Sequence, residues 1–183
     1  RRVVAVDEGL GERGVLLALA ATAYHAVSGG GRRAQIVPPD LIVGHGVLGR
    51  LMARLNVAAG QKDTVVWEMN PDRAQGAEGY TVLHPDDDPR RDYHAIYDAS
   101  GDAGILDSLI ARLAPGGEIV LAGFYAERLS FSFPMAFMRE AQIRAAAEWQ
   151  RPDLLAVKTL VEEGVLSLDG LITNHEEAAQ AEH

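Results

Sequence analysis

The feature that most constrains the fold is a glycine-rich turn between a short apolar run and an amphipathic segment. The apolar run covers residues 41–43, Gly44, Gly46 and Gly49 follow it, and residues 47–59 have helical spacing. A strand, a glycine turn and a helix in this order bring the unpaired N–H groups of the helix N-terminus to the end of the strand, where they can receive an anion. The sequence therefore predicts a phosphate-binding turn in an α/β fold.

Each glycine has a separate role in this interpretation. Gly44 permits the tight turn, Gly46 leaves no side chain between the backbone and a pyrophosphate, and Gly49 lets the helix pack on the strand. His45 lies inside the turn, where its side chain either hydrogen-bonds a phosphate or points to solvent; both interpretations stay open. The predicted cradle is the whole turn: Gly44, His45, Gly46, Val47, Leu48 and Gly49.

An acidic residue completes the pattern. Residues 64–67 are typical of a second buried strand, and Glu68 follows at its carboxyl end, where a carboxylate can accept both ribose hydroxyls of a dinucleotide. A negative charge there repels the additional phosphate of NADP, so the sequence favours NAD. The alternative is that Glu68 only caps the loop beginning at Asn70. Arg73 also complicates the choice, because a guanidinium could hold a 2′-phosphate or stack on adenine.

The remaining pattern alternates between strands and helices. Such alternation implies right-handed crossovers and a doubly wound parallel sheet, a three-layer αβα Rossmann fold with ligands at the carboxyl ends of the strands. Further strands are expected at residues 80–83, 93–97, 118–122 and 143–149, and helices at 12–27, 70–79, 105–113 and 153–163.

Composition limits the class of protein. The 183 residues are 48% hydrophobic, which allows one good core but is short for two full domains. The net charge of −9 argues against binding to nucleic acid. No cysteine occurs, which excludes disulfides, cysteine-based zinc sites and thiol nucleophiles and is compatible with a reducing cytoplasm. The most apolar stretch, 15–27, is too short to span a bilayer, so we expect a cytoplasmic protein without an integral membrane segment.

Several segments together resemble the medium-chain dehydrogenase/reductase family, and the resemblance covers nearly the whole chain. They are residues 20–26, the turn 44–49, Asp-Ala-Ser-Gly at 98–101, residues 113–117 and residues 171–173. Within the family, residues 40–50, 97–102 and 117–125 are most similar to members that oxidise a hydroxyethyl side chain on a tetrapyrrole to an acetyl group. This resemblance implies a dehydrogenase that transfers hydride to NAD from a small tetrapyrrole substrate.

The resemblance also implies a division of the chain. Family members have an N-terminal catalytic lobe, which this sequence does not resemble. We therefore expect residues 1–33 to be the end of such a lobe with an interdomain helix, 34–150 to be the NAD-binding Rossmann domain, and 151–183 to return toward the lobe. On this view most of the groups that contact the substrate lie outside the sequence.

Three positions of the first helix bear on the chemistry that the resemblance implies. Thr22 matches the position that approaches the nicotinamide carboxamide, although a helical threonine also commonly bonds a backbone carbonyl. Ala18 stands where zinc-dependent relatives have a cysteine ligand, which argues against a catalytic zinc. His25 is the one histidine expected near the right end to accept the alcohol proton, with a packed histidine as the alternative.

The ends of two later strands are expected to line the nicotinamide and its ribose. Small residues there allow the cofactor to approach closely, and they are Ser100, Gly101, Ala122, Gly123 and Phe124. The aromatic and methionine-rich stretch 131–138 is interpreted as core or dimer contact rather than a pigment-facing surface. Family members commonly pair through the last strand of the sheet, here 143–149, so a homodimer is expected.

Other functions stay open. The chain could belong to another medium-chain alcohol dehydrogenase or to a quinone reductase. An S-adenosylmethionine methyltransferase also uses a glycine loop with an acid after the second strand, although Gly49 and the sixth strand weigh against it. A non-catalytic module that binds a dinucleotide is the third alternative. His84, His94 and His175 show no metal-ligand spacing.

Overall fold

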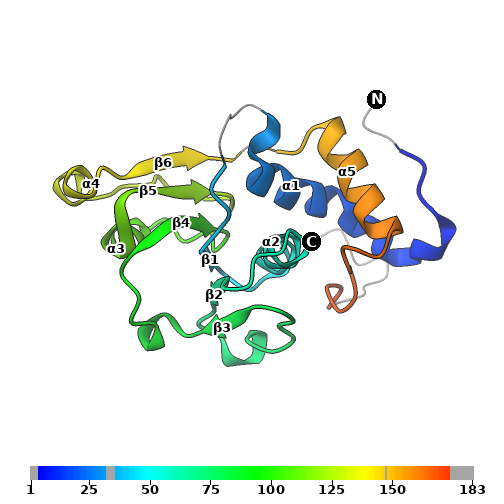
Figure 1. Ribbon diagram of the computed structural model, residues 1–183, viewed down its shortest axis with the longest axis horizontal. Helices are drawn as coiled ribbons and strands as arrows, with labels where there is room; N and C mark the ends of the chain where they lie inside the picture. The colour runs from blue at the N-terminus through cyan, green and yellow to red at the C-terminus, as the bar shows by residue number, and fades with distance from the viewer. Residues whose placement is uncertain (1–3, 32–35, 147, 174–183) are drawn as a thin grey trace.

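The computed structural model describes residues 4–31, 36–146 and 148–173. At its centre is a six-stranded sheet in the order β3-β2-β1-β4-β5-β6, with every neighbouring pair parallel (Figure 1). The strands are β1 (Leu41–Val43), β2 (Val65–Trp67), β3 (Thr81–Leu83), β4 (Tyr93–Asp98), β5 (Leu113–Leu121) and β6 (Gln142–Ala145).

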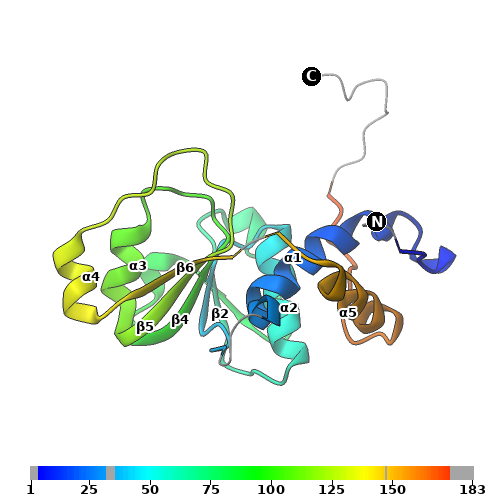
Figure 2. The same cartoon turned by 90° about the horizontal axis from the view of Figure 1, so that it is seen from above.

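Helices cover both faces of the sheet. Figure 2 shows α3 and α4 on one face and α1, α2 and α5 on the other. The α-helices are α1 (Leu17–Ser28), α2 (Val47–Ala58), α3 (Leu106–Arg112), α4 (Phe133–Arg139) and α5 (Arg151–Glu162), and the short 3-10 helices are η1 (Glu8–Leu16), η2 (Gly29–Gly31), η3 (Pro71–Arg73) and η4 (Pro85–Asp87). The predicted doubly wound, three-layer αβα fold is therefore confirmed.

The register of the central strands determines where the site lies. Val43 of β1 pairs with Trp67 of β2 on one side and with Asp98 of β4 on the other. The three strands therefore end at one level, and the residues that follow them meet at the carboxyl edge of the sheet. The chain order reverses direction at β1, which makes this edge the expected ligand position of a doubly wound sheet.

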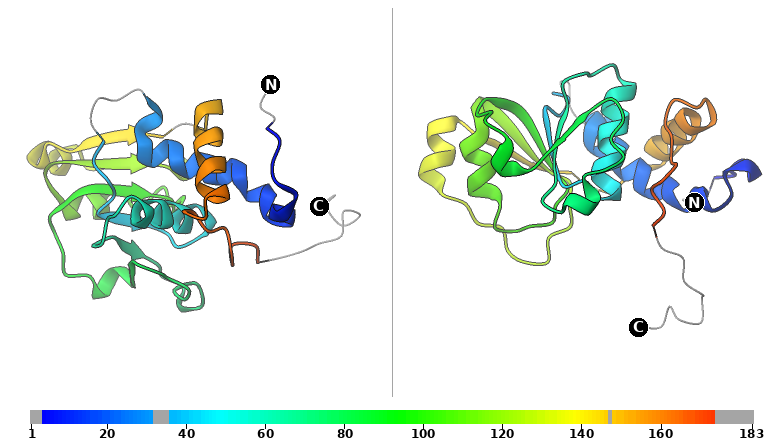
Figure 3. Two further views of the ribbon diagram at one scale, coloured as in Figure 1. Left: turned by 45° about the vertical axis from the view of Figure 1, so that its right-hand side comes forward. Right: turned by 90° about the horizontal axis from the view of Figure 1, so that it is seen from below.

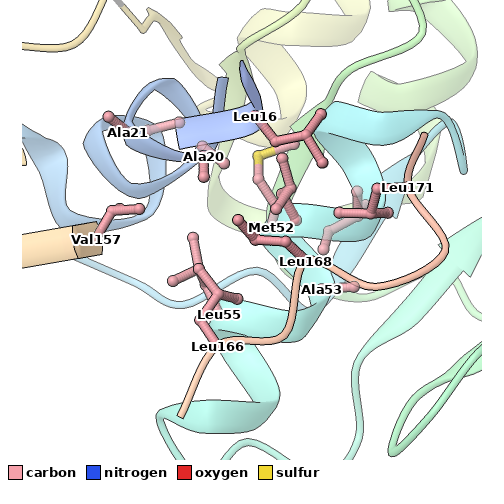
Figure 4. Packing of buried hydrophobic residues seen from close by; sticks show 14 of the residues in the cluster. Leu16, Ala20, Ala21, Met52, Ala53, Leu55, Val157, Leu166, Leu168 and Leu171 are labelled. Carbon is pink, nitrogen blue, oxygen red and sulfur yellow. The ribbon is translucent and has the colours of Figure 1, made fainter. Parts of the chain in front are cut away.

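Each face of the sheet has its own apolar core. On the α1, α2 and α5 face, Met52, Leu51 and Ala53 of α2 are fully buried against residues from α1 and α5. Figure 4 shows how Leu166, Leu168 and other residues after α5 close the outer side of this cluster. On the α3 and α4 face, the fully buried side chains come from the strands and α3; they are Leu41, Tyr93, Ile96, Leu106, Leu109, Ile110, Leu113 and Ile119. The sheet is thus buried on both faces, as its apolar strands require.

Two predicted helices are wrong in extent. The helix expected at 12–27 begins as α-helix only at Leu17, and residues 12–16 belong to the 3-10 helix η1, in which Gly11 has the non-helical angles φ 50° and ψ −134°. The helix expected at 70–79 is one 3-10 turn, η3. Asn70 does cap it, accepting a hydrogen bond from the Asp72 N–H, but Gly76 has φ 79° and the chain turns away.

The predicted division at residues 33 and 150 stays a prediction. Within the described residues, α1 and α5 share one core with the central strands, and Figure 3 shows α5 lying across α1. The tail 174–183, with His175, and the basic pair Arg32 and Arg33 lie outside the described residues. No helix in the described ranges is long and apolar enough to cross a bilayer.

Candidate functional site

A pocket of about 280 Å³ opens at the carboxyl edge of the sheet, beside the glycine turn. Five of the predicted cofactor-binding residues line it, namely Gly44, Gly46, Glu68, Arg73 and Ser100. The remaining lining residues are Val43, Trp67, Met69, Pro85, Ala99, Asp102 and Ile105. The structure thus brings the glycine turn, the acid after β2 and the end of β4 together around one space.

The three glycines of the turn meet different demands. Gly44 has φ 96°, and a Cβ there would lie 3.2 Å from the Ser100 Cα. A Cβ on Gly49 would lie 1.8 Å from the Gly44 carbonyl oxygen, so close contact of helix and strand requires glycine. A Cβ on Gly46, in contrast, would meet no atom within 4 Å. Gly44 and Gly49 are therefore needed by the fold, whereas the space before Gly46 is left open.

The start of α2 is well suited to an anion. Gly46 is its N-cap residue, no side chain caps the helix, and its first turn carries no acidic residue. The first intrahelical bond runs from the Arg50 N–H to the Gly46 carbonyl. The N–H groups of the first turn consequently point out of the helix with the positive end of its dipole, where a phosphate is stabilised.

Glu68 joins the glycine turn to the loop after β2. Its side chain is 4% exposed; Oε2 accepts the His45 backbone N–H at 3.1 Å, and Oε1 accepts the Asn70 N–H at 2.8 Å. The predicted capping role of Glu68 is therefore present. It does not use up the carboxylate, because two oxygens offer about four lone-pair sites. Glu68 remains able to accept a ribose hydroxyl in the pocket that it lines.

Arg73 faces Glu68 across the mouth of the pocket. Its Nη2 lies 3.3 Å from Glu68 Oε1, and its side chain is 61% exposed. The guanidinium is therefore free to move toward a ligand, while its charge offsets part of that of Glu68. Selection against a 2′-phosphate then depends on whether its repulsion by Glu68 is stronger than its attraction to Arg73.

The His45 side chain does neither of the two things expected of it. It is fully buried, with Nδ1 2.6 Å from the Arg73 carbonyl oxygen and Nε2 2.8 Å from the Tyr80 hydroxyl. Burial lowers the pKa of His45 below its ordinary value, and the nearby Arg50 charge adds to this. The sequence could not show this position because its partners come from a loop about 30 residues downstream. The His45 backbone N–H is likewise bonded to Glu68, so a phosphate would contact the N–H groups at the start of α2 instead.

The side chain of His25, the predicted proton acceptor, is enclosed by the protein. Its ring is buried, and Nδ1 lies 2.7 Å from Asp153 Oδ2 of α5. A Cβ on Gly30 would lie 2.3 Å from the ring, so the turn after α1 closes over it. His25 does not line the pocket at Gly44. These contacts agree with the alternative of a packed histidine, and a role as proton acceptor stays a prediction.

Thr22 shows the contact that the simpler interpretation predicts. Its hydroxyl donates to the Ala18 carbonyl at 3.2 Å, and it does not line the pocket. A role at the nicotinamide end stays a prediction. Among the described residues, no group of three or more His, Asp or Glu side chains is placed to hold a metal ion.

The ends of β4 and β5 are fastened together. Asp98 is fully buried; its Oδ1 accepts the Ser100 hydroxyl at 2.6 Å, and its Oδ2 accepts the Tyr125 hydroxyl at 2.7 Å. Burial and the Asp98 charge raise the pKa of Tyr125. A Cβ on Gly123 would lie 3.0 Å from the Gly101 N. Small residues here are thus explained by contact between the two loops, and their role toward a cofactor stays a prediction, as it does for Ala122.

Several large apolar side chains in the second half of the chain are open to solvent. Phe124, in the loop after β5, is 94% exposed. On α4, Phe133, Phe137 and Met138 are 68%, 67% and 77% exposed, so the core role considered for this stretch is wrong for these residues. They border a pocket of about 600 Å³ that includes Ile143 at the edge strand β6. The dimer-contact and pigment-facing interpretations are both compatible with this exposure.

Sequence reasoning missed several residues of the site. Trp67, Met69, Pro85 and Ile105 line the pocket but belong to no motif, and Asp102 lies in a quoted motif without being singled out. The signal that could have found Trp67 and Met69 is position, since they lie at or just beyond the carboxyl end of β2.

Comparisons with known proteins identify similar chains, although no protein-family model matches. The chain is 58% identical over 180 residues to 2-desacetyl-2-hydroxyethyl bacteriochlorophyllide A dehydrogenase of Rhodobacter capsulatus, covering 98% of this chain and 56% of that relative. The protein of the same name from Cereibacter sphaeroides is 56% identical over the same share of this chain and 55% of its own length. This chain therefore spans about half the length of the curated relatives it matches.

A solved structure confirms the fold from another direction. Acetophenone reductase of Geotrichum candidum, solved in complex with NAD, superposes with a TM-score of 0.75 at 22% identity, covering 90% of this chain and 49% of that one.

Proposed function

We propose that this chain, a homologue of about half of a medium-chain dehydrogenase, is the NAD-binding Rossmann part of an alcohol dehydrogenase. The reaction we assign to the whole enzyme is oxidation of the hydroxyethyl group of a bacteriochlorophyllide to an acetyl group, in bacteriochlorophyll biosynthesis. The 58% identity to the Rhodobacter capsulatus dehydrogenase supports this substrate.

The observation that carries the proposal is the space in front of Gly46. The two other glycines of the turn are required by contacts within the protein, whereas a Cβ on Gly46 would meet nothing within 4 Å. Because the uncapped first turn of α2 opens onto the same space, a pyrophosphate fits there with its oxygens against backbone N–H groups. The missing side chain at Gly46 is then explained by the ligand.

In this proposal, each part of the site contacts a different part of the dinucleotide. The α2 N-terminus holds the pyrophosphate, and Glu68, beside it in the same pocket, accepts the ribose hydroxyls of the adenosine half. Trp67, Met69 and Ile105 supply apolar surface of the kind that an adenine ring requires. The bound nicotinamide would supply the hydride acceptor. The protein's own contribution is to bind, orient and desolvate, and Ser100, Gly101, Ala122, Gly123, Phe124 and Thr22 are assigned to the nicotinamide half.

We assign NAD rather than NADP as the cofactor. The buried Glu68 carboxylate stays in place through two backbone N–H groups, whereas the exposed Arg73 side chain is held by one ion pair. The fixed negative charge at Glu68 repels a 2′-phosphate, whereas the exposed Arg73 charge is screened by water and attracts it less, so NADP is disfavoured.

We also assign a homodimer, formed at the outer edge of the sheet. Strand β6 pairs with β5 on one side and is last in the strand order. The exposed side chains of Phe133, Phe137 and Met138 lie on α4, next to this edge. A second copy placed there extends the sheet and removes the apolar surface from water.

The test is a comparison of two glycine substitutions. Gly46→Ala adds one methyl group in front of α2 and meets no protein atom, so the thermal unfolding midpoint stays within about 2 °C while NADH affinity falls at least about tenfold, roughly 1.4 kcal/mol. Gly14→Ala is the matched control, because its Cβ also meets nothing within 4 Å but lies in η1.

Calorimetric titration with NADH measures both affinities. Equal affinity of the wild-type chain and Gly46→Ala contradicts the proposed pyrophosphate position. Loss of affinity in Gly14→Ala to the same degree assigns the effect to the fold rather than to the ligand.

A further inference from the structure

The loops that follow β4 and β5 are joined through one buried carboxylate. Asp98, the last residue of β4, is fully buried, and both of its oxygens accept hydrogen bonds. Its Oδ1 accepts the hydroxyl of Ser100 at 2.6 Å and the Ser100 N–H at 2.9 Å, while its Oδ2 accepts the Tyr125 hydroxyl at 2.7 Å. A carboxylate taken out of water needs such donors. Asp98 therefore binds one residue in each loop.

The backbones of the two loops are also in contact. The Asp98 carbonyl accepts the N–H groups of Ala122 and Gly123, both at 2.8 Å. A Cβ on Gly123 would lie 3.0 Å from the Gly101 N, and a Cβ on Gly101 would lie 2.9 Å from the Phe124 carbonyl oxygen. The loops are therefore packed backbone against backbone, so a shift of one loop displaces the other.

The direction of each hydrogen bond in this group is determined by its chemistry. An ionised carboxylate has no hydrogen to donate, so the hydroxyls of Tyr125 and Ser100 both donate to Asp98. Burial and the Asp98 charge raise the pKa of Tyr125, so the phenol keeps its hydrogen. Ser100 Oγ in turn accepts the Asp102 N–H at 3.1 Å, and both Ser100 and Asp102 line the pocket beside the glycine turn. A chain of hydrogen bonds thus runs from Tyr125 to the wall of the pocket.

We propose that Tyr125, acting through Asp98, is a positioning residue for the nicotinamide ring, because its hydroxyl holds the loop after β5 against the loop after β4. The proposal rests on the dinucleotide function proposed above, which assigns Ser100, Gly101 and Gly123 to the nicotinamide half. Tyr125 does not line the pocket beside the glycine turn. It therefore acts through the position of the two loops.

Loss of the Tyr125 hydroxyl affects the two halves of the dinucleotide differently. Without it, Asp98 Oδ2 loses its donor and the loop after β5 is less firmly held. Binding of the nicotinamide must then order this loop, which costs conformational entropy and weakens binding. The groups proposed to hold the adenosine half, at Gly46 and Glu68, come from the start of α2 and the end of β2. Affinity for the adenosine half is therefore expected to change little.

The experiment compares two ligands by calorimetric titration of the wild-type chain and Tyr125→Phe. One ligand is NADH, and the other is ADP-ribose, which has the adenosine, both phosphates and the second ribose but no nicotinamide. The ratio of the two affinities isolates the contribution of the nicotinamide ring. In Tyr125→Phe the NADH affinity is expected to fall about five- to tenfold, while the ADP-ribose affinity stays within about twofold of wild type.

The matched control is Tyr97→Phe. It removes a hydroxyl in the same way, but this hydroxyl donates to the Val37 carbonyl at 3.0 Å, ahead of β1 and outside both loops. Tyr97→Phe is therefore expected to keep the wild-type ratio of NADH to ADP-ribose affinity. Thermal unfolding of both variants measures what each hydroxyl contributes to stability. A merely structural role of Tyr125 lowers the unfolding midpoint and leaves the ratio unchanged.

Failure of this inference and failure of the dinucleotide function give different results. A wild-type ratio in Tyr125→Phe, or an equal loss of both affinities, overturns the role of Tyr125. A wild-type chain that binds ADP-ribose as tightly as NADH also overturns it, because the nicotinamide then contributes nothing, although the dinucleotide function stands. A wild-type chain that binds neither ligand refutes the dinucleotide function itself, and this inference with it.

Discussion

Single residues of this site hold the fold together and line the candidate pocket at the same time. Glu68 caps the loop after β2 and holds the glycine turn, yet it still lines the pocket. His45 is hidden from the pocket but touches the loop that carries Arg73. A sequence motif therefore predicts where a residue lies better than it predicts which atoms its side chain contacts.

Substitution of Glu68 is expected to change the preference of the site between NADH and NADPH. In Glu68→Gln the negative charge is lost, and the amide N–H₂ must face either the His45 N–H or the Asn70 N–H. NADH affinity is expected to fall about tenfold while NADPH affinity changes little, which moves the preference by roughly 1.4 kcal/mol. Fluorescence titration with both nucleotides measures the ratio.

The control for Glu68 lies in the same loop. Glu78→Gln makes the same chemical change at an exposed residue that does not line the pocket, so the NADH to NADPH ratio remains that of wild type. An unchanged ratio in Glu68→Gln refutes the assignment of NAD preference to this carboxylate.

At the scale of elements, the parts of the site that the sequence could predict are those determined by local geometry. The strand 41–43, the helix after it and the acid at the end of β2 follow from short-range pattern, and all three are found. The loop 70–79 was predicted as a helix from its Asn-Pro start. Its actual course depends on Gly76 and on hydrogen bonds from Arg50 and His45. Such distant partners leave no mark on local sequence.

A second element, α4, yields a prediction about assembly. Replacing both Phe133 and Phe137 with serine removes exposed apolar surface beside β6, so the homodimer is expected to dissociate while NADH affinity stays within about twofold of wild type. Sedimentation velocity measures the change. Val15→Ser is the control, since Val15 is 74% exposed in η1 and distant in sequence from α4.

Two outcomes of this experiment would contradict the proposed dimer, and each has a different meaning. A wild-type chain that sediments as a monomer at all concentrations contradicts the dimer. A dimer that survives both substitutions shows that another surface joins the copies.

At the scale of the whole molecule, the order of strands and helices predicts the fold. The proposed function rests on similarity to about half the length of a longer dehydrogenase. Parallel strands that alternate with helices left one reasonable architecture, and the strand order agrees with it. The packing of His25, the predicted proton acceptor, does not follow from local sequence. Asp153 and the turn at Gly30 enclose its ring, and α5 lies more than a hundred residues away in sequence. Only the folded chain brings these residues together.

The proposed binding of NAD is tested by calorimetric titration of the wild-type chain with NADH, NADPH and S-adenosylmethionine. We expect one site per chain that binds NADH most tightly, NADPH at least about tenfold more weakly, and S-adenosylmethionine without measurable heat. Preference for S-adenosylmethionine, or no binding of either nicotinamide dinucleotide, would contradict it.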